Sequence, residues 1–259
     1  MLVLALLAGV VGLAVGSFLN VVVWRVPRGE SVVRPASACP RCHTAIRHRD
    51  NVPVAGWVLL RGRCRDCAEP ISARYPLVES LTGVLFAMLA WAFGPDPVLP
   101  AYLYLAAVGV ALALIDIDVR RLPDALTLPS YVVVAALLGL GALLGSPSGE
   151  LVRALFGGAA MYAVYLALCL ARPGGMGFGD VKLAGVLGMA TGWLGWEVWG
   201  VALFAGFLFG GLWGVSVIAR GRGTRTSAVP FGPFMLVGVL FAVIVGQRVA
   251  DAYLALTVG

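Results

Sequence analysis

The stretch "MLVLALLAGVVGLAVGSFLNVVVW", residues 1–24, contains no charged side chain and is long enough to cross a lipid bilayer. A spanning helix needs roughly 20 apolar residues. The stretch lacks a basic n-region and runs longer than a signal peptide core, so we interpret it as a transmembrane helix. Similar apolar runs recur along the chain, which predicts an all-α, polytopic membrane protein.

The composition supports this fold class. Of the 259 residues, 60% are hydrophobic and 12% are charged, and the mean hydropathy is +0.94. A soluble domain of this length buries its core with far less apolar content. We expect about eight spans, the sixth of them short and rich in glycine. They are expected at residues 2–24, 78–94, 101–118, 125–144, 151–171, 181–195, 198–219 and 232–256.

The basic residues predict how the spans are oriented. With the N-terminus outside, 17 of the 19 Lys and Arg residues fall in inside loops, and only Arg153 and Arg248 lie outside. Cytoplasmic loops carry such an excess of positive charge. The net charge of +6 is therefore attributed to topology rather than to nucleic-acid binding. We expect a multi-pass membrane protein with the lipid bilayer as its surroundings.

One long polar segment, residues 25–77, follows the first span and separates it from an expected seven-helix core over 78–259. Within this segment lie two C-x2-C pairs, 21 residues apart. Paired thiolates on two tight turns are typical of a tetrahedral structural zinc site. The predicted ligands are Cys39, Cys42, Cys64 and Cys67.

Two alternatives apply to this loop. The four cysteines could form two disulfides, but the predicted cytoplasmic location keeps thiols reduced. His43 or His48 could replace one cysteine ligand, although both are more readily interpreted as ordinary loop residues. A small zinc loop depends on its metal to fold, so we assign the ion a structural role.

Acidic residues inside the predicted spans mark a candidate active site. Asp116 and Asp118 lie in "ALALIDIDVRRLPD", and Asp180 lies among glycines in "RPGGMGFGDVKLAG". The predicted topology places both stretches near the cytoplasmic face, where ionisable groups at membrane depth indicate function. Positions two apart on a helix differ by about 200°, so only one of Asp116 and Asp118 faces a shared site.

Structural roles for these residues also have to be considered. Asp116 could pair with Arg120, Asp118 could pair with Arg121, and Asp180 could cap its own helix. Taken together, two carboxylates meeting at one face favour either an acid–base pair that activates water for peptide hydrolysis or an ion path. The glycines around Asp180 would allow close helix approach and leave room for an extended substrate.

Five motifs in this order resemble those of the bacterial type IV prepilin peptidases, intramembrane aspartyl proteases of the GxGD type. They are "GSFLNVVVWRVP" (16–27), the paired C-x2-C turns, "IDIDVRRLPD" (115–124), "GMGFGDVKL" (175–183) and "PFGPF" (230–234). The resemblance implies that Asp116 and Asp180 are the catalytic aspartates and that Asp118 is not.

The resemblance further implies a substrate, a second activity and a location in the bacterial cytoplasmic (inner) membrane. The family removes a short basic leader from prepilins and type II secretion pseudopilins, after a glycine, on the cytoplasmic side. Many members then methylate the new N-terminal residue with S-adenosylmethionine. No glycine-rich fingerprint for that cofactor is visible, so its binding residues are unassigned. The alternatives are a peptidase without methyltransferase activity, a proton-coupled transporter using Asp116 and Asp180, and a silent membrane anchor. The oligomeric state is not predicted.

Overall fold

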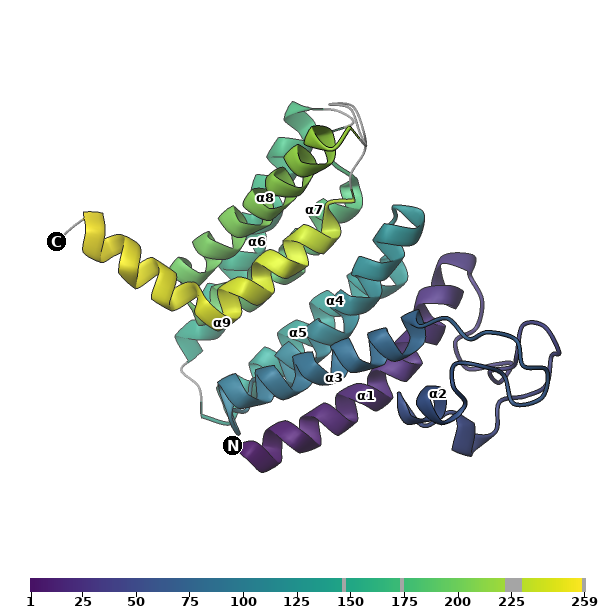
Figure 1. Ribbon diagram of the computed structural model, residues 1–259. Helices are drawn as coiled ribbons and strands as arrows, with labels where there is room; N and C mark the ends of the chain where they lie inside the picture. Colours follow the sequence, from purple (N-terminus) through teal and green to yellow (C-terminus); the bar gives the residue numbers. More distant parts are fainter. Residues whose placement is uncertain (146–147, 173–174, 222–229, 258–259) are drawn as a thin grey trace. The chain divides into compact units, whose positions relative to one another are not determined.

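The computed structural model describes residues 1–145, 148–172, 175–221 and 230–257, which form helices and no strand. Figure 1 shows the elements in chain order. The long helices are α1 (Leu2–Arg25), α3 (Arg74–Phe93), α4 (Leu99–Val119), α5 (Asp124–Leu143), α6 (Ser148–Ala171), α7 (Phe178–Leu194), α8 (Trp196–Ala219) and α9 (Gly232–Thr257). The loop after α1 contains the five-residue α2 (Ala55–Leu59) and a 3-10 turn (His48–Asp50), and a second such turn (Val26–Arg28) ends α1.

A helix stands at each of the eight predicted spans, and the all-α, polytopic fold class is confirmed. Within the described ranges, seven helices are long and apolar enough to cross a membrane. The exception is α7, the expected short span, which has 17 residues. Every α7 residue from Asp180 to Trp193 except Lys182 is buried. Protein rather than lipid therefore surrounds α7. Four residues used in the sequence interpretation lie outside the described ranges: Pro173, Gly174, Arg222 and Arg225.

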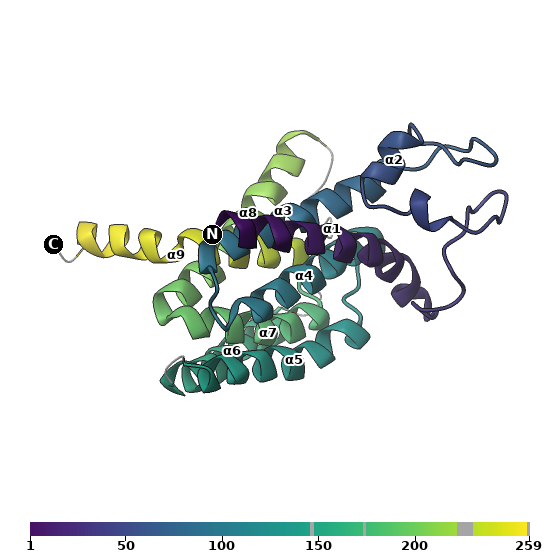
Figure 2. The ribbon, with the colours of Figure 1, turned by 90° about the horizontal axis from the view of Figure 1, so that it is seen from below.

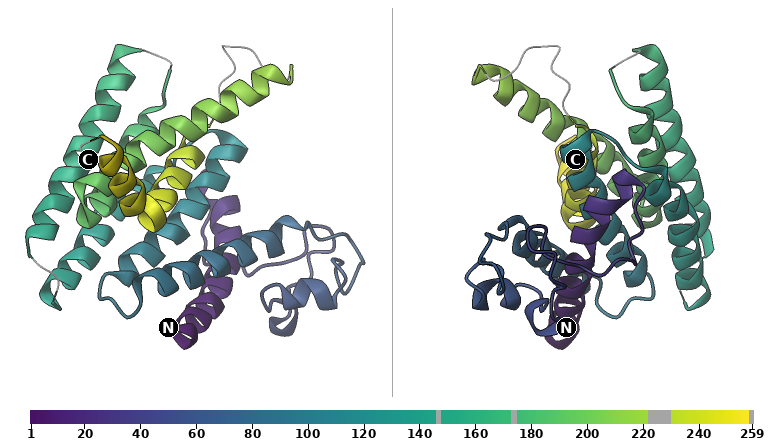
Figure 3. Two further views of the ribbon diagram at one scale, coloured as in Figure 1. Left: turned by 60° about the vertical axis from the view of Figure 1, so that its left-hand side comes forward. Right: turned by 90° about the vertical axis from the view of Figure 1, so that its right-hand side faces the viewer.

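The chain divides into two compact units, and the first comprises Met1–Leu99 and Leu103–Ala111. In this unit α1 packs along α3. Small residues permit the close approach, since a Cβ added to Gly16 would lie 2.7 Å from the Cα of Glu79. The polar loop leaves the end of α1 and returns to the start of α3, as Figure 3 shows in dark blue.

The second unit comprises Pro100–Tyr102 and Leu112–Gly259. Its closest helix pairs are α6 with α7 and α8 with α9, while α5 also packs against α7. Figure 2 shows α5, α6 and α7 side by side. Between α6 and α7, a Cβ on Gly188 would lie 2.5 Å from the carbonyl oxygen of Gly157. Glycine is therefore required at this crossing, and α7 is held at the centre of the unit.

Candidate active site and metal site

Few polar side chains are buried in the described part of the chain, and they fall into two kinds. The buried Thr and Ser residues each donate to the carbonyl oxygen four residues earlier in the chain. Among the described residues, the buried Asp and Glu side chains are Glu79, Asp116 and Asp180. Carboxylates deep in a membrane helix are costly and typically functional. These three residues are therefore the candidates for a catalytic role or for attaching a loop to a helix.

Asp116 lies near the end of α4 and is 6% exposed. Its Oδ2 accepts a hydrogen bond from the backbone N–H of Gly232, with N and O 3.2 Å apart. No ion pair joins its carboxylate to Arg120, whose own backbone N–H bonds the Asp116 carbonyl oxygen at 2.9 Å. Asp118 is exposed. The structure thus turns Asp116, and not Asp118, toward the interior of the second unit.

Asp180 is the third residue of α7 and is 8% exposed. Its Oδ2 accepts a hydrogen bond from the Gly177 N–H at 3.2 Å, and its own N–H bonds the Gly177 carbonyl oxygen at 3.0 Å. The carboxylate therefore does cap its helix, as one alternative proposed. This bond uses only one oxygen. No described residue donates to the Oδ1 atom of either aspartate, so each keeps one oxygen for another partner.

One leucine links the two aspartates. A Cβ built on Gly179, the residue before Asp180, would lie 3.0 Å from the Cβ of Leu122. A Cβ built on Gly232 would lie 3.4 Å from Cδ2 of Leu122 and 3.0 Å from Oδ2 of Asp116. Leu122 therefore contacts both the glycine that precedes Asp180 and the glycine that bonds Asp116. The structure brings the two predicted catalytic residues together.

Aromatic packing holds the segment that bonds Asp116. The Phe231 ring lies 5.2 Å from that of Phe207 and 6.2 Å from that of Tyr165, measured between centroids. Tyr165 is 2% exposed. The motif "PFGPF" supports the family resemblance, but its residue types do not predict a role for Phe231 or Gly232. Tyr165 was not identified, because an aromatic residue in an apolar helix carries no distinguishing signal.

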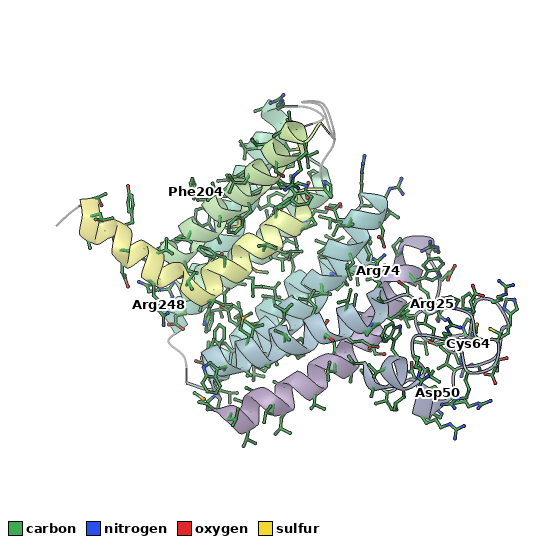
Figure 4. All side chains as sticks on the ribbon, in the orientation of Figure 1. Arg25, Asp50, Cys64, Arg74, Phe204 and Arg248 are labelled. Atoms are coloured by element: carbon green, nitrogen blue, oxygen red, sulfur yellow. The ribbon has the colours of Figure 1, made fainter. Side chains whose placement is uncertain are left out.

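The four cysteines of the polar loop converge in the first unit. Their sulfur atoms all lie within 4.8 Å of one another, and all four thiols are free. Figure 4 labels Cys64 within this loop. The Sγ atoms of Cys39 and Cys67 are 3.7 Å apart, and those of Cys42 and Cys64 are 4.0 Å apart. Sulfur ligands at the usual distance from one tetrahedral zinc ion are separated by about 3.8 Å. The cluster thus fits a four-sulfur metal site, and neither loop histidine belongs to it.

Two copies of one turn build this cluster. In the first, the Cys39 N–H bonds the Thr44 carbonyl and the His43 N–H bonds the Cys39 carbonyl. In the second, Cys64 pairs with Glu69 and Ala68 pairs with Cys64 in the same pattern. His43 and Ala68 occupy equivalent positions with φ of 56° and 58°. The imidazole of His43 is therefore at a turn position and not at a ligand position.

Ion pairs and thiol electrostatics complete the loop. Three pairs each join the first turn region to the second: Arg41 with Glu69, Arg47 with Asp66, and Arg65 with Asp50. Side-chain and backbone hydrogen bonds from Thr44 lower the pKa of Cys42 to about 6. At Cys67, a hydrogen bond from the Glu69 backbone lowers the thiol pKa. Burial and the neighbouring thiols raise it by more, so that the pKa is about 12. A bound cation would favour the thiolate form of all four cysteines.

Glu79 attaches this loop to α3. Its Oε2 accepts a hydrogen bond from the Val54 N–H at 2.7 Å, at the start of α2. Val54 has a φ of 60°, which is unfavourable for a β-branched residue. Glu79 is 7% exposed. The sequence does not single out Glu79, because an acidic residue near the end of a predicted span is common. The loop group that Glu79 binds is a backbone N–H, which no residue type marks.

Comparison with known proteins covers nearly the whole chain. A family model described as "Bacterial Peptidase A24 N-terminal domain" matches residues 10–93, and one described as "Type IV leader peptidase family" matches residues 103–215. No solved structure matches the chain significantly.

Similar curated proteins carry the name prepilin leader peptidase/N-methyltransferase. The protein from Aeromonas hydrophila is 35% identical over 93% of this chain and 91% of its own length. Those from Neisseria gonorrhoeae and Pseudomonas aeruginosa are 37% and 34% identical, over 89% and 94% of this chain and 87% and 91% of their own lengths. The family resemblance drawn from the motifs is confirmed.

Proposed function

The chain belongs to the type IV leader peptidase family, and we propose that it removes the short basic leader from type IV prepilins and type II secretion pseudopilins. The observation that carries this proposal is the burial of two carboxylates, Asp116 and Asp180, beside glycines that both contact Leu122. The names of the relatives also support methylation of the new N-terminal residue as a second activity.

The proposed cleavage step uses the two aspartates as an acid–base pair sharing one proton. The ionised carboxylate removes a proton from a water molecule as the water oxygen attacks the scissile carbonyl carbon. The protonated partner donates to the carbonyl oxygen, which gives a neutral tetrahedral diol. The aspartic acid formed in the first step then donates its proton to the peptide nitrogen, while the other carboxylate removes a proton from a diol hydroxyl, so that the C–N bond breaks to give a carboxylic acid and an amine. The bonds from Gly232 to Asp116 and from Gly177 to Asp180 would hold both carboxylates during these transfers.

We further propose that Cys39, Cys42, Cys64 and Cys67 hold one structural Zn²⁺ ion. The donor set and the spacing of the sulfur atoms support this assignment. The ion would supply cross-linking of the two turns, since a loop of this size has little apolar core of its own. The ion has no role in the cleavage step.

The proposed orientation places the N-terminus outside and residues 25–77 in the cytoplasm, followed by a protease core over 78–259. The excess of Lys and Arg in the loops on one side supports it. Both aspartates then lie near the cytoplasmic face, where a basic leader joins an apolar helix. S-adenosylmethionine is the proposed methyl donor, and no residue of the chain is assigned to it.

The test is cleavage of a purified prepilin by the purified protein, followed by mass spectrometry of the product. Asp116→Asn and Asp180→Asn should each lower the cleavage rate by several orders of magnitude, because Asn keeps the volume but cannot exchange the proton. Asp118→Asn is the matched control and should retain most of the rate, since its side chain is exposed. Near-normal cleavage by either of the first two variants, or an intact prepilin with the unmodified protein, would refute the proposal.

A further inference from the structure

Lys182 lies two residues after Asp180 and makes an ion pair across two helices. Its Nζ is 2.7 and 2.8 Å from the two carboxylate oxygens of Asp124, the first residue of α5. The Lys182 side chain is 23% exposed and that of Asp124 is 55% exposed. The ammonium group also lies 5.3 Å from the ring centroid of Phe178. The lysine is therefore the one residue in the buried stretch of α7 that reaches outward, and it does so to contact α5.

The backbone of Lys182 is attached to α5 as well. The Tyr131 hydroxyl donates to the Lys182 carbonyl oxygen at 2.6 Å. A Cβ added to Gly185, one turn further along, would lie 2.1 Å from that hydroxyl oxygen, so only glycine admits it. Side chain and main chain of one residue thus hold the first turns of α7 on α5.

These contacts bracket Asp180. On one side of the aspartate, Gly179 contacts Leu122. On the other side, Lys182 pairs with Asp124. Leu122 and Asp124, which make these two contacts, are separated only by Pro123, whose φ is fixed by its ring. The segment 122–124 therefore determines where the first turn of α7 lies. That turn has N–H groups without intrahelical partners, so its position depends on contacts such as these.

We propose that Asp124 and Lys182 are positioning residues for the cleavage reaction, which hold the Asp180 carboxylate in register with that of Asp116. The inference rests on the proposed function. A partly exposed ion pair contributes little to global stability. Its loss would leave the fold in place but free the turn that carries Asp180, and acid–base chemistry is sensitive to displacements of about 1 Å.

The experiment measures kcat and KM for prepilin cleavage by Lys182→Met, Asp124→Asn and the reversed pair Asp124→Lys with Lys182→Asp. We expect kcat to fall about 10- to 100-fold in each single variant, with KM unchanged. The reversed pair should recover most of the lost kcat. Asp251→Asn is the matched control, because it removes an exposed carboxylate on α9 that accepts a hydrogen bond from Gln247. Its kcat should equal that of the unmodified protein.

Three results would overturn the inference: single variants with unchanged kcat, a loss confined to KM, or a reversed pair no better than the single variants. Tyr131→Phe provides a second test that changes no charge. It removes the bond to the Lys182 carbonyl and should lower kcat in the same way, and an unchanged kcat would count against the proposal. The failure of the proposed function has a different signature, namely cleavage that survives in Asp180→Asn.

Discussion

The backbone N–H of Gly232 donates a hydrogen bond to Oδ2 of Asp116, 116 positions earlier in the chain, at 3.2 Å. This bond gives the start of α9 a direct part in orienting a buried carboxylate. The Phe231 ring, packed against Phe207 and Tyr165, holds the donor in place. The proposed site therefore has three elements, contributed by α4, α7 and the segment that begins α9.

Gly232→Ala is expected to reduce prepilin cleavage with little loss of protein. The new Cβ would lie 3.0 Å from Oδ2 of Asp116 and 3.4 Å from Leu122, so the carboxylate has to move. We expect kcat to fall about tenfold or more, as for other small displacements of a catalytic group. Gly211→Ala on α8 is the control, since nothing lies within 4 Å of its added Cβ. Equal rates for the two variants would contradict a role for Gly232.

One zinc ion per chain is expected in protein purified without chelators. Cys→Ser at position 39, 42, 64 or 67 removes a sulfur ligand, so the metal content should drop toward zero by elemental analysis. Cys169→Ser is the control and should keep its metal, because Cys169 lies on α6, outside the cluster. Full zinc content in a variant at position 39 or 64 would exclude the four-cysteine site.

Replacing Glu79 should loosen the polar loop. Glu79→Met removes the acceptor for the Val54 N–H, and the strained turn at Val54 then loses its compensating bond. We expect proteolysis between residues 48 and 60 to become several-fold faster, measured by limited digestion and mass spectrometry. Glu30→Met makes the same chemical change at an exposed position of the loop. Digestion at the same rate in both variants would show that Glu79 does not anchor the loop.

The Asp50–Arg65 pair should make loop stability depend on pH in the acid range. Hydrogen bonding to the Arg65 guanidinium lowers the pKa of Asp50 below its ordinary value of 3.8. A group whose pKa is lower in the folded state stabilises the fold above its unfolded pKa, and this contribution is lost as pH falls through the folded value.

Hydrogen exchange of the loop in Asp50→Asn and the unmodified protein would test this dependence. The unmodified loop should be better protected at pH 6. The difference should shrink as the pH falls below 3.8. A difference that is constant with pH would mean that Asp50 acts through its shape rather than its charge. Asp66→Asn, at the neighbouring pair with Arg47, is the matched comparison.

The positions of the spans and of the cysteine turns are set by the sequence alone. Each apolar run satisfies its own backbone hydrogen bonds as a helix, so hydropathy along the chain is sufficient to locate it. Helical periodicity likewise predicts that only one of Asp116 and Asp118 faces the interior, although it does not say which one. The pairing of four cysteines into one cluster follows from their spacing, because two tight turns with sulfur ligands have one common use in a reduced compartment.

Tertiary structure alone decides what holds these residues. Backbone N–H groups are chemically alike, so no letter in the sequence marks Gly232 as the donor to Asp116 or Val54 as the donor to Glu79. The contacts of Leu122 with Gly179 and of Asp124 with Lys182 join segments nearly 60 residues apart, and they exist only because α5 packs on α7. Local preference determines each helix, whereas long-range packing determines which backbone and side-chain groups reach the two aspartates.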